Sequence, residues 1–257
     1  MSPHPLDDRQ LQRYARHLLL DGFEVDAQQR LADATVLVVG AGGLGSPALL
    51  YLAAAGVGCL MVADPDQVDL TNLQRQVVHR EASLGQAKVD SAAATLGELN
   101  PHVRTVALRQ RADATTLPGW VAGCDLVLDC SDNYATRQAV NAACVAARKP
   151  LAWAAAVGWE AQAGLYDPGD AHSPCYACLF PPAAPVSDTP CAVMGVFAPL
   201  VGQAGLLQAG EALKQLAGLG SALAQRLWLF DGRSLEAQLL QVRPDPHCPV
   251  CAAQRAA

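Results

Sequence analysis

The sequence has little positive charge and few aromatic residues. Its 257 residues include 18 lysines and arginines against 24 aspartates and glutamates, giving a formal net charge of -6 at pH 7, and aromatic residues make up 5%. A chain without a broad basic surface is poorly suited to a phosphate backbone, so nucleic acid is not an expected partner. An acidic protein can still hold a local cationic pocket, and a small anionic ligand is therefore not excluded.

The N-terminus lacks the features of a secretory signal. It reads MSPHPLDDRQLQRYARH, with neither a short apolar core nor a small-residue cleavage site, and we expect a cytoplasmic protein. In that compartment the nine cysteines are more often metal ligands, catalytic groups or small core residues than disulfide partners. Their spacing has to decide between these roles.

Two uncharged stretches, 34–63 and 192–210, approach or exceed the roughly 20 residues that cross a bilayer. The first divides into a β-branched run, a glycine turn, an Ala/Leu helix and a second apolar run, which is the pattern of a buried β-α-β unit. The second contains Pro199 and several glycines. We expect neither to span a membrane.

Strand-like and helix-like segments alternate along the chain. Strands are expected at 35–39, in an apolar run ending before Asp64, at 103–108, 126–130, 151–157, in a run ending at Tyr166, and at 226–230 and 237–242. Helices are expected at 86–99, 134–148 and 200–219, after an N-terminal helix whose apolar face is formed by Leu11, Tyr14, Ala15, Leu18 and Leu19. This order predicts an α/β fold: a doubly wound, Rossmann-like, mostly parallel sheet with a C-terminal antiparallel extension.

A glycine-rich loop follows the first predicted strand. The sequence reads TVLVV, then GAGGLG, and continues into a helix. In this setting the backbone can approach a phosphate and direct N–H groups at it, and Asp64, about 20 residues further on, is placed to bind ribose hydroxyls. The pattern favours an adenosine-containing ligand over a merely structural turn, without separating NAD from ATP. The loop candidates are Gly40, Gly42, Gly43 and Gly45.

The segment after Asp64 is unlike that of a typical dehydrogenase. Arg75 and, at the start of the next helix, Lys88 are placed to clamp phosphates, and attack on a nucleotide phosphate needs such charge neutralisation whereas hydride transfer does not. Either residue alone is better explained as an ordinary surface cation. The same segment holds Asp66, Thr71, Asn72, Leu73 and Gln74.

A further acidic candidate follows the strand LVLDC. Asp132 and Asn133 come just after this strand, at the carboxyl edge of the sheet where doubly wound folds bind their ligands. A carboxylate at that position is suited to hold magnesium across the phosphates.

Four of the cysteines form two CxxC pairs. Cys175 and Cys178 form one, and Cys248 and Cys251 form the other, about 70 residues later. One CxxC pair is ambiguous between redox and metal chemistry, but two in a cytosolic chain favour a closed structural zinc site. Because four thiolates leave zinc no open position, the metal is not expected to take part in chemistry.

The motifs together carry a resemblance. They are Arg13-Tyr-x-Arg16-His, GAGGLG, Asp64-x-Asp66, Asn72-Leu-Gln-Arg75-Gln76, Lys88, Cys130-Ser-Asp132-Asn133 and the two CxxC pairs. This ordered set resembles the MoeB/ThiF/HesA adenylyltransferases, relatives of the ubiquitin-activating enzymes, and is most similar to their molybdopterin-synthase branch. The likeness runs from the N-terminal helix to the last CxxC pair.

The resemblance implies an ATP site and a homodimer. The glycine loop, Asp64, the stretch from Thr71 to Arg75, Lys88 and the Asp132-Asn133 pair would bind ATP, with Asp132 as the magnesium ligand. In this family an arginine of the partner subunit's N-terminal helix reaches the triphosphate. Arg16 is the matching position, with Arg13 as the second choice.

The resemblance also divides a single domain, 1–257, into an N-terminal helical arm (1–30), a nucleotide-binding half (31–150) and a half that binds the protein substrate and zinc (151–257). The stretch 154–158, between Trp153 and Trp159, would line the groove for that substrate's tail, although a core role for both tryptophans is an equal alternative. Cys191 matches a cysteine that some members use in a persulfide or thioester-like step. A dispensable loop cysteine is equally consistent with the sequence.

The implied function is ATP-dependent adenylation of the C-terminal glycine carboxylate of a small ubiquitin-like sulfur carrier with an expected Gly-Gly end. This step would serve thiocarboxylate formation in molybdopterin or thiamin biosynthesis. Six residues follow Cys251, without room for a rhodanese domain, so we expect a separate sulfur donor, such as a cysteine desulfurase or rhodanese. The alternatives are an NAD-dependent oxidoreductase and a relative that dehydrates threonylcarbamoyl adenosine in tRNA. The sequence does not identify the carrier, the pathway or the donor.

Overall fold

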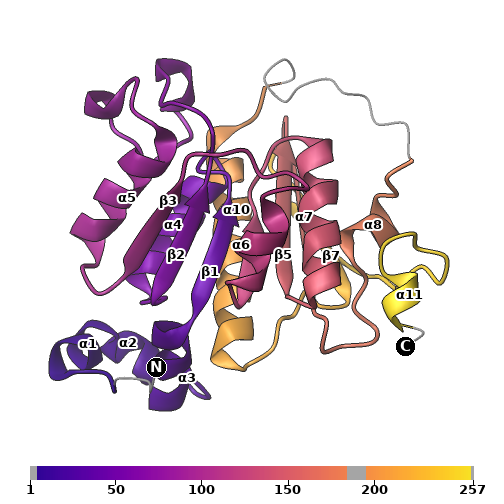
Figure 1. Ribbon diagram of the computed structural model, residues 1–257, viewed down its shortest axis with the longest axis horizontal. Coiled ribbons are helices and arrows are strands. Elements are labelled where there is room, and N and C mark those ends of the chain that lie inside the picture. The colour runs from indigo at the N-terminus through magenta and orange to yellow at the C-terminus, as the bar shows by residue number, and fades with distance from the viewer. Residues whose placement is uncertain (1–4, 184–194, 256–257) are drawn as a thin grey trace.

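The computed structural model describes residues 5–183 and 195–255. These residues form one sheet of eight strands in the order β3-β2-β1-β4-β5-β6-β7-β8 (Figure 1). The strands are β1 Thr35–Val39, β2 Cys59–Ala63, β3 Arg104–Leu108, β4 Leu126–Asp129, β5 Leu151–Val157, β6 Glu160–Tyr166, β7 Arg226–Asp231 and β8 Glu236–Gln241. The first five are parallel and the last three extend the sheet in antiparallel fashion from β5.

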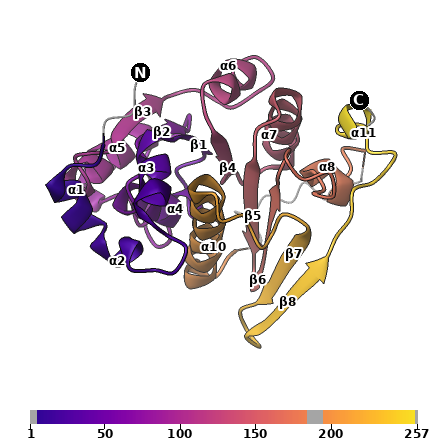
Figure 2. The ribbon, with the colours of Figure 1, turned by 90° about the horizontal axis from the view of Figure 1, so that it is seen from below.

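Helices cover both faces of the sheet (Figure 2). They are α1 Asp8–Arg13, α2 Ala15–Leu18, α3 Val25–Asp33, α4 Gly45–Ala54, α5 Lys88–Leu99, α6 Leu117–Ala122, α7 Tyr134–Ala147, α8 Tyr176–Leu179, α10 Ala198–Ala217 and α11 Ala252–Arg255, with 3₁₀ turns η1 Leu70–Asn72 and η2 Glu81–Ser83. In β1, Val36 and Val38 pack with α4, α5 and α10, whereas Leu37 and Val39 pack with α6 and α7. This alternation is the period of two that a strand imposes on its side chains.

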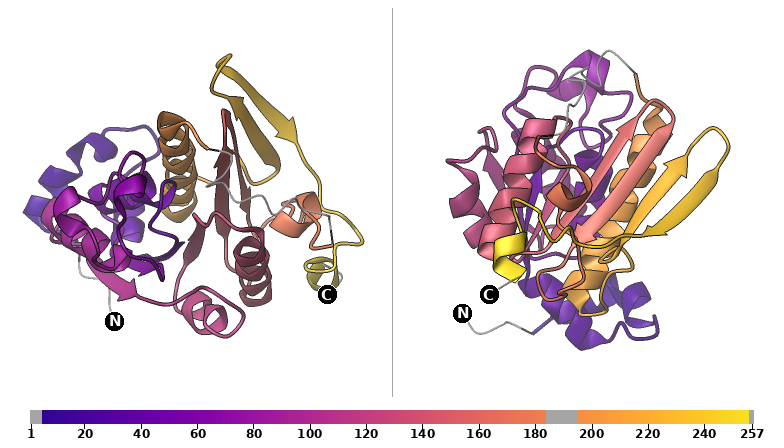
Figure 3. Two further views of the ribbon diagram at one scale, coloured as in Figure 1. Left: turned by 90° about the horizontal axis from the view of Figure 1, so that it is seen from above. Right: turned by 90° about the vertical axis from the view of Figure 1, so that its right-hand side faces the viewer.

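The antiparallel extension differs from the parallel part in burial. Every residue of β8 is exposed, whereas β4 is buried throughout. Figure 3 shows β7 and β8 reaching beyond the helical layers. A doubly wound fold with an antiparallel C-terminal extension is therefore confirmed. Among the described residues, no helix combines the length and the apolar character needed to cross a bilayer.

The predicted strands and long helices agree with the structure to within about two residues, but the N-terminal helix was predicted wrongly. It is broken at Tyr14 into α1 and α2, and Leu19, expected on the apolar face, is 75% exposed. The physical reason is contact with residues that are distant in the sequence. The Tyr14 ring packs directly on Gly56, where an added Cβ would lie 2.4 Å from the ring, and Asn100 donates to its hydroxyl. The short helices α3 and α6 were not predicted.

Candidate nucleotide site and cysteine cluster

The sheet order places two loops at its switch point. The chain leaves β1 toward β2 and β3 on one side and continues from β4 on the other, so the loops after β1 and β4 meet at the carboxyl edge. Gly40 has φ +99°, and a Cβ there would lie 2.7 Å from the Cys130 carbonyl oxygen. Only glycine permits both this backbone conformation and this contact. Ligands of doubly wound folds bind in such a crevice.

The glycine loop itself is tightly closed. A Cβ on Gly45 would lie 1.9 Å from the Gly40 carbonyl oxygen, and one on Gly43 would lie 2.7 Å from Val201 Cγ1 and 3.3 Å from Arg75 Cδ. The missing side chains thus let α4 begin directly over the end of β1 and let Arg75 lie against the loop. At Gly42 an added Cβ would meet Gln76 Nε2 only at 3.6 Å.

The two acids after β2 have different surroundings. Asp64 is 6% exposed, and its oxygens accept from the Ala41 and Asp66 backbone N–H groups at 2.8 and 2.9 Å. Burial raises the pKa of the Asp64 carboxyl. The Asp66 side chain is largely exposed and pairs with Lys88 Nζ at 3.0 Å. Asp64 therefore holds the glycine loop, whereas Asp66 holds the lysine.

The loop around η1 carries the second cation. Asn72 Oδ1 accepts from Gln76 Nε2 at 2.8 Å and from Arg75 Nη2 at 3.4 Å, and the Thr71 carbonyl oxygen accepts from Arg75 Nη1 at 3.3 Å. These contacts hold the arginine side chain over Gly43. Leu73 is half-buried in the same loop, and Thr71 and Gln74 are exposed.

After β4, Asp132 and Asn133 are both exposed. Asn133 caps α7, because its Oδ1 accepts from the Thr136 N–H at 2.9 Å. Arg137 stabilises this turn: its side chain is buried and donates to the carbonyl oxygens of Ser131 and Ala154. Arg137 thus ties the Asp132 loop to β5. Sequence reasoning missed it, although a charged residue on the apolar face that Val140 and Cys144 define was a usable indication.

The N-terminal candidates lie far from these loops within one chain. Tyr14 packs on Gly56, just after the C-terminal end of α4, whereas the glycine loop precedes its N-terminal end. Figure 1 shows α1 and α2 below the amino ends of the strands. Arg16 is exposed there, and Arg13 Nη1 donates to the Leu99 carbonyl oxygen. Neither residue reaches the nucleotide site of its own chain.

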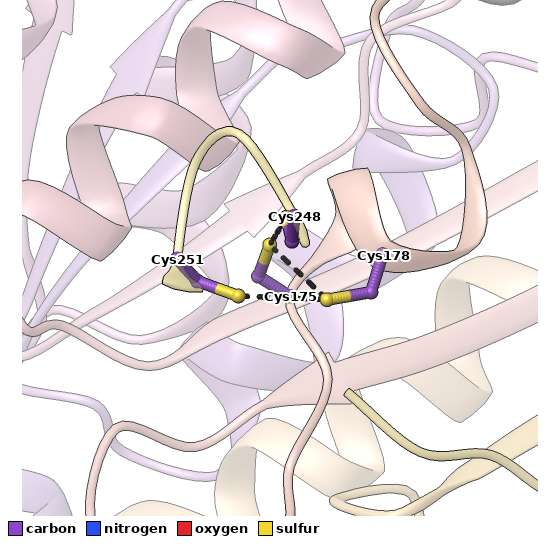
Figure 4. Close-up of side chains that lie close together, drawn as sticks. All are labelled: Cys175, Cys178, Cys248 and Cys251. Carbon is purple, nitrogen blue, oxygen red and sulfur yellow. Dashed lines mark hydrogen bonds between the residues drawn. The ribbon is translucent and has the colours of Figure 1, made fainter. Parts of the chain in front are cut away.

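The four CxxC cysteines converge, as Figure 4 shows. Their sulfurs all lie within 4.8 Å of one another, with Cys175 Sγ 3.9 Å from Cys178 Sγ and 3.7 Å from Cys248 Sγ, and Cys178 Sγ 3.5 Å from Cys251 Sγ. Zn–S bonds of about 2.3 Å in a tetrahedron require S–S separations of about 3.8 Å. The donor set and its spacing therefore fit a zinc ion. The hydrogen bond with Cys175 lowers the pKa of the Cys178 thiol.

Two further side chains touch this cluster. Asn141 of α7 donates to Cys175 Sγ at 3.6 Å, and Arg255 of α11 donates to Cys251 Sγ at 3.4 Å. Arg255 also donates to the carbonyl oxygens of Ala171 and Ser173. The C-terminal segment is thus fastened to the loop that precedes α8.

Outside the cluster, the four other cysteines that the structure describes are core residues. Cys59, Cys124, Cys130 and Cys144 are buried, and burial raises the pKa of each thiol, that of Cys124 to about 11. Their burial fits small core residues and not reactive groups. Cys191 lies outside the described residues.

Strands β5 to β8 line a hollow of about 520 Å³. Ala155, Ala156 and Ala161 contribute small walls, and Phe230 and Glu160 also line it. Of the two tryptophans, Trp153 is buried in the core, whereas Trp159 is 42% exposed and stacks on Phe197. The core alternative is therefore correct for Trp153 and wrong for Trp159.

The sequence matches the ThiF family over residues 14–250. This chain belongs to the ThiF family. It is 45% identical over 251 residues to the sulfur carrier protein ThiS adenylyltransferase of Escherichia coli K12, covering 98% of this chain and 99% of that protein. It is 42% identical over 246 residues to the molybdopterin-synthase adenylyltransferase of the same strain, with coverages of 96% and 98%.

Solved structures with a ThiF-like fold are similar to the structure of this chain. The crystal structure of E. coli MccB with ATP superimposes with a TM-score of 0.81 and 26% identity over 93% of this chain and 74% of that one. The family resemblance predicted from the motifs is confirmed. The two E. coli adenylyltransferases are similar to this ThiF-family chain to nearly the same degree, so identity does not select a branch. Neither the oxidoreductase alternative nor the tRNA-modifying one is favoured by these relatives.

Proposed function

We propose that this ThiF-family protein uses ATP to adenylate the C-terminal carboxylate of a small ubiquitin-like sulfur-carrier protein. The names of the E. coli relatives support the reaction class. The observation that carries the proposal is one edge of the sheet. The glycine loop after β1 has Arg75 against Gly43, Lys88 is held by Asp66 after β2, and Asp132 follows the adjacent strand β4. A nucleotide would bind at this edge, and the small-walled hollow of β5 to β8 would take a glycine tail.

In the proposed reaction a carrier carboxylate oxygen attacks the α-phosphorus of ATP. A new P–O bond forms, the bond from the α-phosphorus to the bridging oxygen breaks, and pyrophosphate leaves with the electron pair, giving an acyl adenylate. The carboxylate is already ionised, so no general base is needed. Arg75 and Lys88 neutralise charge that develops on the phosphate oxygens. The Asp66 contact keeps the Lys88 ammonium at the site, and the loop contacts orient the nucleotide.

Two metals belong to this proposal. Asp132 is exposed at the switch point and would hold Mg²⁺, which when bound neutralises phosphate charge. Cys175, Cys178, Cys248 and Cys251 would hold a structural Zn²⁺ with no open position for chemistry. These side chains fit both ions by donor chemistry, and the four sulfurs also fit zinc by spacing.

We further propose a homodimer in which Arg16 serves the partner's nucleotide site. Its exposure at the edge opposite its own glycine loop supports this arrangement. The single-domain organisation, with arm 1–30 and halves 31–150 and 151–257, is proposed in the same way. We also propose a cytoplasmic location, a carrier tail ending in Gly-Gly, a separate sulfur donor, and a role in molybdopterin or thiamin biosynthesis. For Cys191, a chemical step and a dispensable thiol stay open.

The test is to incubate the protein with MgATP and each candidate carrier and to look for the acyl-adenylate mass, with ATP–pyrophosphate exchange as the rate measurement. We expect exchange only with a carrier ending in Gly-Gly, and a loss of about 100-fold or more in Asp132→Ala. Asp26→Ala, which removes an exposed carboxylate of α3, is the matched control and should retain full exchange. The absence of an adduct with every Gly-Gly carrier would contradict the proposal.

A further inference from the structure

Two routes of hydrogen bonds run from Ala41 of the glycine loop to α5. One route runs through the acids already described. The Ala41 N–H donates to Asp64 Oδ2 at 2.8 Å, the Asp66 N–H donates to Asp64 Oδ1 at 2.9 Å, and Lys88 Nζ donates to Asp66 Oδ2 at 3.0 Å. The loop and the lysine are therefore linked through the end of β2.

The other route runs through His79, which the proposed reaction does not use. His79 Nε2 lies 2.9 Å from the Ala41 carbonyl oxygen and Nδ1 lies 3.0 Å from Ser91 Oγ. A carbonyl oxygen only accepts, so Nε2 carries the proton and Nδ1 accepts from the Ser91 hydroxyl. Ser91 lies three residues after Lys88 on α5, which puts the two on neighbouring positions of the helix. Both routes therefore end on the first turn of α5.

These two routes hold Ala41 at both its N–H and its carbonyl oxygen. Asp64 binds its N–H and His79 binds its carbonyl oxygen. Because a trans peptide unit is planar, the carbonyl oxygen of Ala41 and the N–H of Gly42 point in opposite directions and rotate together. Fixing the carbonyl on His79 therefore directs the Gly42 N–H away from the histidine. A phosphate cradle depends on such a fixed direction of its N–H groups.

The ring is built to stay in one state. His79 is 4% exposed, its ring is held at both nitrogens, and burial lowers its pKa, which keeps the imidazole neutral. Loss of the hydrogen bond from His79 to the Ala41 carbonyl costs free energy, because the buried carbonyl oxygen is then left without a partner.

We propose that His79 is a positioning residue for nucleotide binding: its Nε2–H fixes the Ala41 carbonyl and thereby sets the glycine loop relative to Lys88. This inference rests on the proposed ATP site. It predicts that the donor at Nε2, and not the bulk or the aromaticity of the ring, determines affinity for the nucleotide.

Three variants separate these properties. His79→Gln keeps an amide N–H donor at about the reach of Nε2, His79→Asn places its amide nearer Nδ1 and loses the reach to Ala41, and His79→Leu keeps volume without any donor. We expect the Kd for a non-hydrolysable ATP analogue, and the KM for ATP in exchange, to rise roughly tenfold in the Leu and Asn variants, the size of one lost hydrogen bond. The value of kcat should change little, because ground and transition states lose the same contact.

The glutamine variant should stay within about threefold of wild type. Equal impairment of the Gln and Asn variants would overturn the proposal, as would wild-type affinity in a folded Leu variant; if the Leu variant fails to fold, the Gln and Asn pair still decides. Thermal melts of each variant report folding separately. Because the analogue's Kd is measured without a carrier, a wild type that binds the analogue but exchanges with no carrier would refute the proposed function and leave this test intact.

Discussion

The nucleotide site and the cysteine cluster are held together in different ways. At the nucleotide site, loops within residues 40–88 are joined by bonds between protein groups: Asp64 to Ala41, Asp66 to Lys88, His79 to Ala41. At the cysteine cluster, side chains 73 residues apart meet through their sulfurs. Donor and acceptor, or cation and anion, are paired in the first site, whereas the second brings four like groups into contact.

This difference has an energetic consequence. Paired groups compensate the desolvation of one another, so the nucleotide site is complete before its ligand arrives. Four crowded thiols gain little from one another and are stabilised by a shared cation, whose binding free energy then becomes folding free energy for the segments it joins. The first site should therefore survive removal of its ligand, and the second should not.

The largest expected effect comes from breaking the cluster. Cys248→Ala should reduce bound zinc from one ion per chain to none and lower the free energy of unfolding by at least about 3 kcal/mol, or roughly 6–12 °C in thermal midpoint. The segment around α11 should become accessible to protease. Zinc content, thermal melts and limited proteolysis measure these changes.

Cys144→Ala is the matched control, because it removes a buried thiol of α7 that lies outside the cluster. It should keep its zinc and lose only the small free energy of one packed sulfur. If the nucleotide affinity of Cys248→Ala falls as far as its zinc content does, the two sites are not independent, and the comparison fails.

An intermediate effect is expected within the nucleotide site. Gly45→Ala would place a Cβ 1.9 Å from the Gly40 carbonyl oxygen, and neither backbone can yield without opening the loop. We expect a loss of about 2–3 kcal/mol in stability and at least tenfold weaker nucleotide binding. Gly210→Ala, in the interior of α10 with no atom within 4 Å of its added Cβ, should instead gain about 0.5–1 kcal/mol. Calorimetric melts measure the stability of the two variants, and nucleotide titration measures their affinity. Equal stability and equal affinity in the two variants would contradict this prediction.

The same contrast explains what the sequence could and could not predict. Glycines after a β-branched run, and cysteines at CxxC spacing, are short patterns, so the glycine loop and the cysteine cluster could both be predicted from the sequence. The break of the N-terminal helix at Tyr14 could not be predicted, because the position of this ring depends on the space that Gly56 leaves. His79 and Arg137 were missed as functional candidates for a related reason. Their partners are backbone carbonyls on other elements, and a carbonyl has no identity in the sequence.

The smallest effect concerns pH and isolates the histidine of the nucleotide site. Burial lowers the pKa of His79 in the folded protein below its ordinary value of 6.5, so the folded state disfavours the charged ring. Its contribution to stability is fully present above pH 6.5 and is lost as pH falls from there toward the folded pKa. Protonation of the cysteines also releases zinc in acid, so the informative quantity is the difference between wild type and His79→Gln. Between pH 7.5 and 5.5 the wild-type thermal midpoint should fall by about 2–4 °C more than that of the variant. Parallel pH profiles of the two proteins would mean that folding does not hold the His79 ring neutral. The proposed difference between the nucleotide site and the cysteine cluster would then lose its support at this residue.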